Sequence, residues 1–258
     1  MPLNLRTGVL VVGSLDWEST IYGGAFVGTP DPIRSNWRKT RLKVDKRSTQ
    51  YVRVPIRYGR LSESRGNTYT MVFSPELGSR LGVGKAIHCR NAVNDIDDLM
   101  REARELWKAE QPKGNGMISA SWGCVAILTS PDFLDNKDAA ARTKLLEDWA
   151  EITREQKGYG AFAFSDSDRT AAGDRPVIEN GRLNIPWPKY RNHLPLSLDL
   201  VLLTATKAEI MPEGTYRTAE EIAGAWKKNP KEDYYFRNNR LAGIQTADDE
   251  EIEKQLDG

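Results

Sequence analysis

The stretch GVLVVGSL, residues 8–15, is a short apolar run that ends in a glycine and a serine. Its length and its valine-rich composition are typical of a buried β-strand. A strand that ends in a Gly-Ser turn can present backbone N–H groups to a ligand, because glycine lets another molecule approach the chain closely. The same pattern also begins domains that bind nothing at this turn, and the residues leave both interpretations open. We expect this strand to start the central sheet.

The residues after this strand, 16–36, contain several glycines and two prolines, so we predict a loop rather than a helix. A dinucleotide-binding fold would need a helix to open directly after the strand, with the spacing G-x-G-x-x-G at its start. That spacing is absent, which argues against a Rossmann fold.

The remaining chain predicts a mixture of strands and helices. Apolar or alternating runs predict strands at 51–59, 68–74, 82–89, 122–130, 158–165, 182–187 and 198–206. Apolar residues at helical spacing predict helices at about 94–110 and 136–156, and three shorter ones after residue 211. The fold class is therefore α+β, with a mixed sheet or small barrel, flanking helices and a helical C-terminal extension. We expect a core domain over 1–210 and an extension over 211–258 that packs on it.

Local signals refine three of these elements. Asn94 is expected to cap the helix that follows it, and Thr218 and Glu221 have the spacing of a capping box. Within the segment 233–246, Tyr234, Tyr235 and Phe236 are followed by Arg and Asn residues. These aromatic residues can form a docking surface, close over a pocket, or fasten the C-terminal helices to the body.

Composition narrows the class of protein. The chain has 258 residues, a formal net charge of +1 and no apolar run long enough to cross a membrane, so we expect no membrane partner. The two cysteines, Cys89 and Cys124, lie in apolar runs and are expected to be buried free thiols in a cytoplasmic protein. Neither C-x-x-C nor H-x-x-x-H occurs, and we expect no metal and no cofactor.

The residues Val12 to Leu15, VGSL, end the first strand and precede an irregular segment. This arrangement resembles the strand–YGSL–loop of the gamma-glutamylcyclotransferase-like family over about residues 8–110, with Val12 where that family has tyrosine. The resemblance implies a small mixed barrel, main-chain binding of an amino-acid portion of the substrate, and a glutamate that acts as acid and base. In this chain the segment 100–110 offers Glu102, Glu105 and Glu110 for that role, and we take Glu102 as the catalytic candidate. The alternation of these glutamates with Arg and Lys is also the pattern of a solvated helix face with ion pairs.

The ligand is expected to be small and anionic or amino-acid-like. Arg53 and Arg57 lie an even number of residues apart, so we expect them on one strand face, where two guanidinium groups can clamp a carboxylate or phosphate. The residues expected to bind the ligand are Gly13, Ser14, Leu15, Trp17, Arg53, Arg57 and Tyr58.

An alternative function comes from the segment 34–65, which has eleven Lys and Arg residues but only two acidic ones. Basic residues interleaved with aromatic ones suit contacts with a nucleic-acid backbone and its bases, so non-enzymatic binding of nucleic acid or nucleotides is possible here. A third interpretation is an assembly in which this segment docks the acidic C-terminal tail of another copy. A solvated basic face without a partner fits the same residues.

Overall fold

The fold is described from a computed structural model of the chain. It describes residues 2–22, 25–27, 31–45, 47–62, 68–111, 116–135, 138–156, 159, 177–190, 194–209, 216–228 and 234–257. These residues form helices and a mixed sheet, which confirms the α+β class.

The helices are spread along the chain. They are α1 (Ser14–Trp17), α2 (Pro32–Arg41), α3 (Ile96–Glu110), α4 (Ala139–Glu155), α5 (Ala219–Lys228), α6 (Tyr234–Leu241) and α7 (Asp249–Asp257).

The strands divide into one large sheet and two hairpins. The large sheet contains β1 (Thr7–Val11), β4 (Thr49–Val54), β7 (Gly82–His88), β8 (Ser119–Ala120), β9 (Gly123–Thr129), β10 (Ile178–Glu179), β11 (Arg182–Leu183), β12 (Lys189–Tyr190) and β13 (Leu200–Thr206). The hairpins are β2 (Thr20–Tyr22) with β3 (Ala25–Val27), and β5 (Ile56–Ser62) with β6 (Thr68–Phe73).

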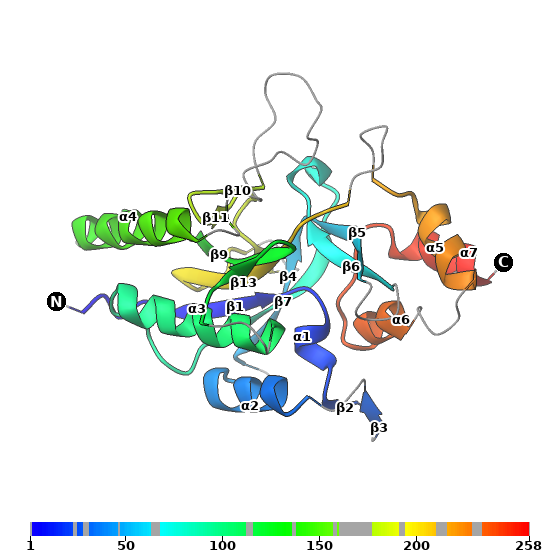
Figure 1. Cartoon of the computed structure of the whole chain (residues 1–258), viewed down its shortest axis with the longest axis horizontal. Helices are drawn as coiled ribbons and strands as arrows, with labels where there is room; N and C mark the ends of the chain where they lie inside the picture. Colours follow the sequence, from blue (N-terminus) through cyan, green and yellow to red (C-terminus); the bar gives the residue numbers. More distant parts are fainter. Residues whose placement is uncertain are drawn as a thin grey trace.

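The large sheet follows the order β10-β11-β9-β13-β1-β7-β4-β12, with β8 paired to β9 (Figure 1). Its two central strands, β1 and β13, are parallel, with Val9 opposite Leu202, whereas β7 and β9 flank them in antiparallel pairing. Among the described strands the path is open, since it ends at β10 and β12, so these residues form a mixed sheet rather than a closed barrel.

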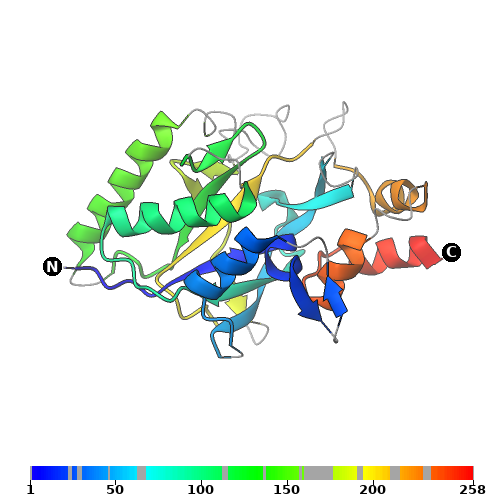
Figure 2. The ribbon, with the colours of Figure 1, turned by 60° about the horizontal axis from the view of Figure 1, so that its bottom comes forward.

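The core lies between this sheet and its helices. Every residue of β1 is buried, as expected for the strand that starts the central sheet. Helix α3 turns its apolar face to β9 and β13, and α2 packs beside α3 (Figures 1 and 2). No helix among the described residues is both long enough and apolar enough to cross a membrane.

The C-terminal helices pack on the β5–β6 hairpin, away from α3 and α4 (Figure 2). Tyr58 of β5 meets Trp226 of α5 edge-on, with ring centroids 5.2 Å apart. The backbone N–H of Val83 donates to the carbonyl of Gln245 at 2.7 Å, so the segment between α6 and α7 also bonds to the large sheet. The division at residue 210 stays a prediction, because residues 210–215 lie outside the described ranges.

The loop predicted over 16–36 is wrong in two places. β1 ends at Val11, and the one-turn helix α1 follows directly after Gly13. A second helix, α2, starts inside the predicted loop, at Pro32. Asp31 caps α2 by accepting hydrogen bonds from the backbone N–H groups of Ile33 and Arg34 at 2.9 and 3.1 Å. Proline is well suited to the first turn of a helix, so here it starts an element instead of ending one.

The single strand predicted over 51–59 is also wrong. Pro55 separates β4 from β5, and the two strands belong to different sheets. The break falls at this residue because proline has no N–H group to continue the hydrogen-bond ladder. Arg53 and Arg57 therefore do not share a strand face, and they cannot act together as the predicted clamp.

Other boundaries differ less. Asp95, not Asn94, caps α3, and its carboxylate accepts from the N–H of Asp98 at 2.9 Å. The strand predicted over 182–187 shrinks to β11, α4 begins at Ala139, and the strand predicted over 158–165 lies outside the described residues except for Tyr159.

Two local predictions are confirmed. The N–H of Thr218 donates to the Glu221 carboxylate at 2.8 Å, and the N–H of Glu221 donates to the Thr218 hydroxyl at 3.2 Å. This reciprocal pair is the capping box that the sequence indicates. Cys89 and Cys124 are buried free thiols, and burial raises the pKa of Cys89 to about 12.

Candidate functional site

The turn after β1 lies at one edge of the large sheet. Since β1 and β13 are parallel, their carboxyl ends reach the same edge, which is where open α/β sheets commonly bind ligands. The turn is fixed by its own backbone, because the N–H of Asp16 donates to the carbonyl of Gly13 at 3.0 Å. The parallel pairing of β1 with β13 brings Gly13 and Thr206 to one region, although they are far apart in the sequence.

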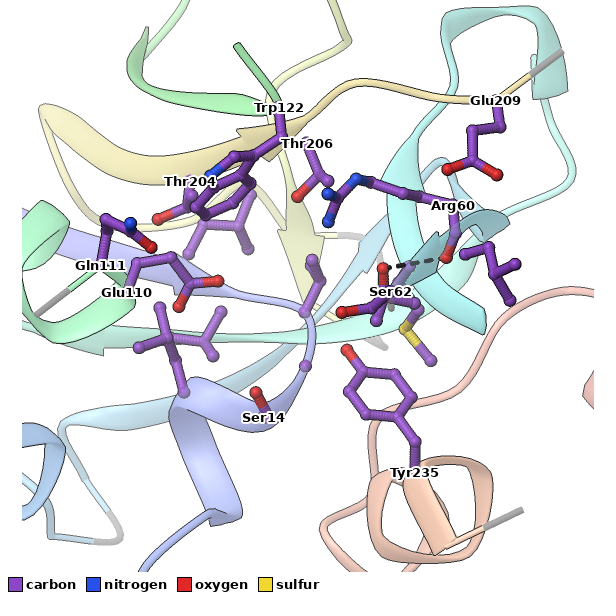
Figure 3. Close-up of a pocket in the computed structure, with 18 residues that line it drawn as sticks. Ser14, Arg60, Ser62, Glu110, Gln111, Trp122, Thr204, Thr206, Glu209 and Tyr235 are labelled. Carbon is purple, nitrogen blue, oxygen red and sulfur yellow. Dashed lines mark hydrogen bonds between the residues drawn. The ribbon is translucent and has the colours of Figure 1, made fainter. Parts of the chain in front are cut away.

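A cavity of about 560 Å³ opens at this edge (Figure 3). One wall is the end of β1 with the following turn, a second is the end of β13, and a third is the β5–β6 hairpin. The C-terminal end of α3 and the first turn of α6 complete it. The polar side chains that line it include Ser14, Ser62, Thr70, Gln111, Thr204, Thr206 and Tyr235.

Charges of opposite sign face each other across the cavity. In Figure 3 the guanidinium group of Arg60 reaches inward from the hairpin, and the carboxylate of Glu110 reaches inward from the opposite side. Glu209 lies on the same side as Arg60. A ligand that carries both a negative and a positive group could therefore meet a complementary charge at each end.

An aromatic pair supports the position of Arg60. Its guanidinium carbon lies 5.2 Å from the centroid of the Trp122 ring, within the range of a cation–π contact. Trp122 in turn stacks on the buried Trp107, with ring centroids 5.1 Å apart and planes 23° apart. Arg60 is thus held over a rigid surface at the cavity wall.

Thr204 lines the cavity and carries a buried hydroxyl group. Its hydroxyl oxygen is buried and has no hydrogen-bond partner among the residues that the structure describes. Buried hydroxyl groups are normally satisfied, so this oxygen is an exception among the residues around the cavity.

Arg34 is buried behind the cavity wall and contacts two of the residues that form it. Its side chain is 3% exposed, and its guanidinium donates to the hydroxyl of Ser14 at 3.0 Å and to the carbonyl of Ala109 at 2.9 Å. The same group forms ion pairs with Glu18 and, at 3.4 Å, with Glu110. One buried cation therefore fixes two residues of the cavity wall, Ser14 from α1 and Glu110 from α3.

The predicted ligand-binding residues divide between the cavity and the core. Gly13, Ser14 and Leu15 line the cavity. Trp17, the last residue of α1, does not line the cavity, because it is fully buried and its indole N–H donates to the Asn239 side chain at 2.7 Å.

The predicted residues of β4 and β5 lie outside the cavity. Arg53 is exposed and donates to the carbonyl of Leu81 at 3.3 Å, whereas the guanidinium of Arg57 lies 4.1 Å from the centroid of the Tyr216 ring. Tyr58 is 1% exposed in the core, and burial raises the pKa of its phenol well above the ordinary value.

Glu102, the predicted catalytic residue, also lies outside the cavity lining. It is buried against α2 and accepts two hydrogen bonds from the guanidinium of Arg41, at 2.6 and 3.2 Å. Burial raises the pKa of its carboxyl, and the charge of Arg41 opposes that effect. Of the three glutamates that the sequence offers on this helix, Glu110 is the one that lines the cavity, while Glu105 lines a small groove between α2 and α3.

Sequence reasoning missed several residues of the cavity wall. The sequence marks Arg60 only as one of the basic residues of 34–65, and Trp122, Thr204 and Thr206 fall inside predicted strands. A usable signal was the pair Thr204 and Thr206, two polar residues at the carboxyl end of an otherwise apolar strand, where ligand sites gather.

The basic segment 34–65 does not form one continuous face. Arg34 and Arg38 are buried, and Arg41 pairs with Glu102. Among the described residues of this segment, exposed Lys39, Lys43, Arg47 and Arg53 remain for a nucleic-acid contact. Two acidic residues of the C-terminal tail contact other arginines of the same chain, Asp248 with Arg80 and Glu253 with Arg240.

Comparisons with known proteins do not add to this geometry. No family model, no curated protein and no solved structure matches the chain. Among the described residues, no group of three His, Cys, Asp or Glu side chains is arranged to hold a metal ion.

Proposed function

We propose that the chain binds a small amino-acid-like ligand in the cavity at the carboxyl ends of β1 and β13. The observation that carries this proposal is the placement of Arg60 and Glu110 on opposite walls, with hydroxyl groups between them. A carboxylate at Arg60 and an ammonium group at Glu110 would match this arrangement. The cavity volume, about 560 Å³, suits a molecule of the size of a short peptide.

A more specific form of the proposal is acyl transfer at a gamma-glutamyl amide, as the resemblance of residues 12–15 implies. In this reaction the α-amino nitrogen of the substrate attacks the γ-carbonyl carbon, the amide C–N bond breaks, and the amine leaves with a proton. In this proposal Glu110, which lines the cavity, takes the role given to Glu102: it accepts the proton from the attacking nitrogen and returns it to the leaving one. Backbone N–H groups at Ser14 and Leu15 would stabilise the developing oxyanion. The cytoplasmic location expected from the two cysteines belongs to the same proposal.

Thermal unfolding with added ligands tests the proposal. We expect gamma-glutamyl peptides to raise the melting temperature at both about 50 and about 300 mM salt, because a buried site is little screened. A shift given only by nucleotides or oligonucleotides, and lost at the higher salt, would favour the alternative in which the exposed basic residues of 34–65 bind nucleic acid.

Glu110→Gln is expected to weaken binding of gamma-glutamylalanine by about tenfold, because it removes the negative charge opposite Arg60. Isothermal titration calorimetry measures this change directly. Glu105→Gln is the matched control, since it makes the same substitution on the same helix but outside the cavity. Unchanged affinity in Glu110→Gln together with a loss in Glu102→Gln would contradict the assignment of Glu110.

A further inference from the structure

Tyr235 brings the C-terminal helices into contact with the cavity. It is the second residue of α6, it lines the cavity, and Figure 3 shows its hydroxyl directed inward. The side chain is 4% exposed, so this hydroxyl belongs to the interior rather than to the outer surface. The aromatic residues at the start of α6 thus do more than fasten helices to the body.

The ring of Tyr235 is held firmly on both sides. It meets Trp17 of α1 edge-on at 5.6 Å and Tyr58 of β5 at 6.5 Å between ring centroids. The indole of Trp17 also bonds to Asn239, one turn further along α6. Because α6 is fixed to α1 by these contacts, the Tyr235 hydroxyl has a defined position beside the turn that follows β1.

Gly13 is what allows that position. A Cβ atom at residue 13 would overlap the hydroxyl oxygen of Tyr235 and would lie 3.3 Å from its ring carbon Cζ. Any side chain at residue 13 would therefore push the hydroxyl away. Glycine at this position therefore allows the turn and α6 to approach each other closely. The preceding residue, Val12, has an apolar side chain.

We propose that the Tyr235 hydroxyl binds a polar group of the cavity ligand, so that α6 forms part of the binding site. The inference rests on the proposed function, in which the cavity takes a small amino-acid-like molecule. A phenol hydroxyl can both donate and accept a hydrogen bond, so it suits either an amide or a carboxylate oxygen of the ligand. Ligand binding and docking of α6 then stabilise each other, since the bound form needs both.

Tyr235→Phe tests the inference with a matched control, Tyr234→Phe. Both variants lose one phenol hydroxyl from the first turn of α6, but only Tyr235 lines the cavity. With gamma-glutamylalanine as the probe, we expect about fivefold to tenfold weaker binding for Tyr235→Phe and a change within about twofold for Tyr234→Phe. Hydrogen exchange of residues 234–241 in the wild-type chain should slow when the probe is added.

A second measurement needs no ligand. Gly13→Ala should lower the melting temperature in the wild-type chain but much less in the Tyr235→Phe chain, where the oxygen that a Cβ would overlap is gone. Equal losses in the two backgrounds would overturn the placement of the hydroxyl. Unchanged probe affinity in Tyr235→Phe would overturn the inference alone, whereas a wild-type chain that binds no probe would overturn the proposed function and the inference with it.

Discussion

Replacing Arg34 by methionine is expected to lower the free energy of unfolding by about 3–5 kcal/mol, which urea unfolding monitored by tryptophan fluorescence can measure. The guanidinium is buried at the meeting point of α1, α2 and α3, where it contacts Glu18, Glu110 and Ser14. Methionine fills a similar volume but has no charge and no donor. Glu18, itself 8% exposed, would then remain buried without this cation, and that is the costly part of the change.

Two further variants separate charge from packing. Adding Glu18→Gln to Arg34→Met should recover part of the loss, because the second substitution removes the carboxylate that was left behind. Arg34→Lys should fall between wild type and Arg34→Met, since one ammonium group cannot reach Ser14, Glu18 and Ala109 together. If Glu18→Gln made Arg34→Met less stable still, the ion pair would not be the source of the effect.

Arg34 also shows why counting charges overstates the exposed basic surface of the segment 34–65. The count of basic residues in 34–65 treats every side chain as exposed, but Arg34, Arg38 and Arg41 recur at helical spacing on one face of α2. Arg38 donates to the carbonyls of Leu15 and Glu18 at 2.6 and 2.5 Å, in the interior. The spacing was visible in the sequence. The carboxylates and carbonyls that these arginines contact belong to other elements, so the sequence alone did not reveal them.

The fold was more predictable than the site, because strand and helix signals are local. The apolar runs that became β1, β7, β9 and β13 needed no knowledge of their neighbours. Two of the failed predictions depend on a proline, because Pro32 starts α2 and Pro55 follows the end of β4. The same residue type serves as a helix start or a strand break according to its context.

The cavity could be predicted only as far as its residues are neighbours in the chain. Gly13, Ser14 and Leu15 form one turn, so a local pattern found them together. Arg60 and Tyr235 reach the cavity from a separate hairpin and from a C-terminal helix, and only the packing of those elements brings them to Gly13. Glu102 and Glu110 lie on the same helix, but Glu102 faces Arg41 of α2 whereas Glu110 lies at the end of α3 that borders the cavity.

Asp249→Asn is expected to remove a pH dependence of stability that the wild-type chain shows. The Asp249 side chain is 3% exposed at the start of α7, and burial raises the pKa of its carboxyl from an ordinary 3.8 to about 6. One carboxylate oxygen accepts from the N–H of Thr246 at 2.8 Å and from the Thr246 hydroxyl. The other oxygen is buried and has no hydrogen-bond partner among the residues that the structure describes.

The sign of the effect follows from the raised pKa. Between pH 3.8 and about 6 the folded chain holds a proton at Asp249 that the unfolded chain has lost, so the free energy of unfolding falls as the pH rises through this range. A shift of this size corresponds to a loss of about 2–3 kcal/mol, complete above the folded-state pKa. Asparagine keeps the oxygen that accepts from Thr246 and carries no charge. The stability of Asp249→Asn relative to wild type should therefore rise by the same amount between about pH 4 and pH 7.5.

Urea unfolding of both chains at the two pH values measures this difference, and Asp248→Asn is the matched control. Asp248 is the preceding residue, but its carboxylate pairs with Arg80 at the surface, and the side chain of that arginine is 60% exposed. We expect Asp248→Asn to keep most of the wild-type pH dependence, because burial is the main cause of the raised Asp249 pKa and the charge of Asp248 is the smallest one. A constant difference between Asp249→Asn and wild type at both pH values would show that the Asp249 carboxylate is solvated or paired in the folded chain. If Asp249→Asn gained more stability over wild type at the lower pH than at the higher pH, the folded-state pKa of Asp249 would be lowered, which contradicts the prediction.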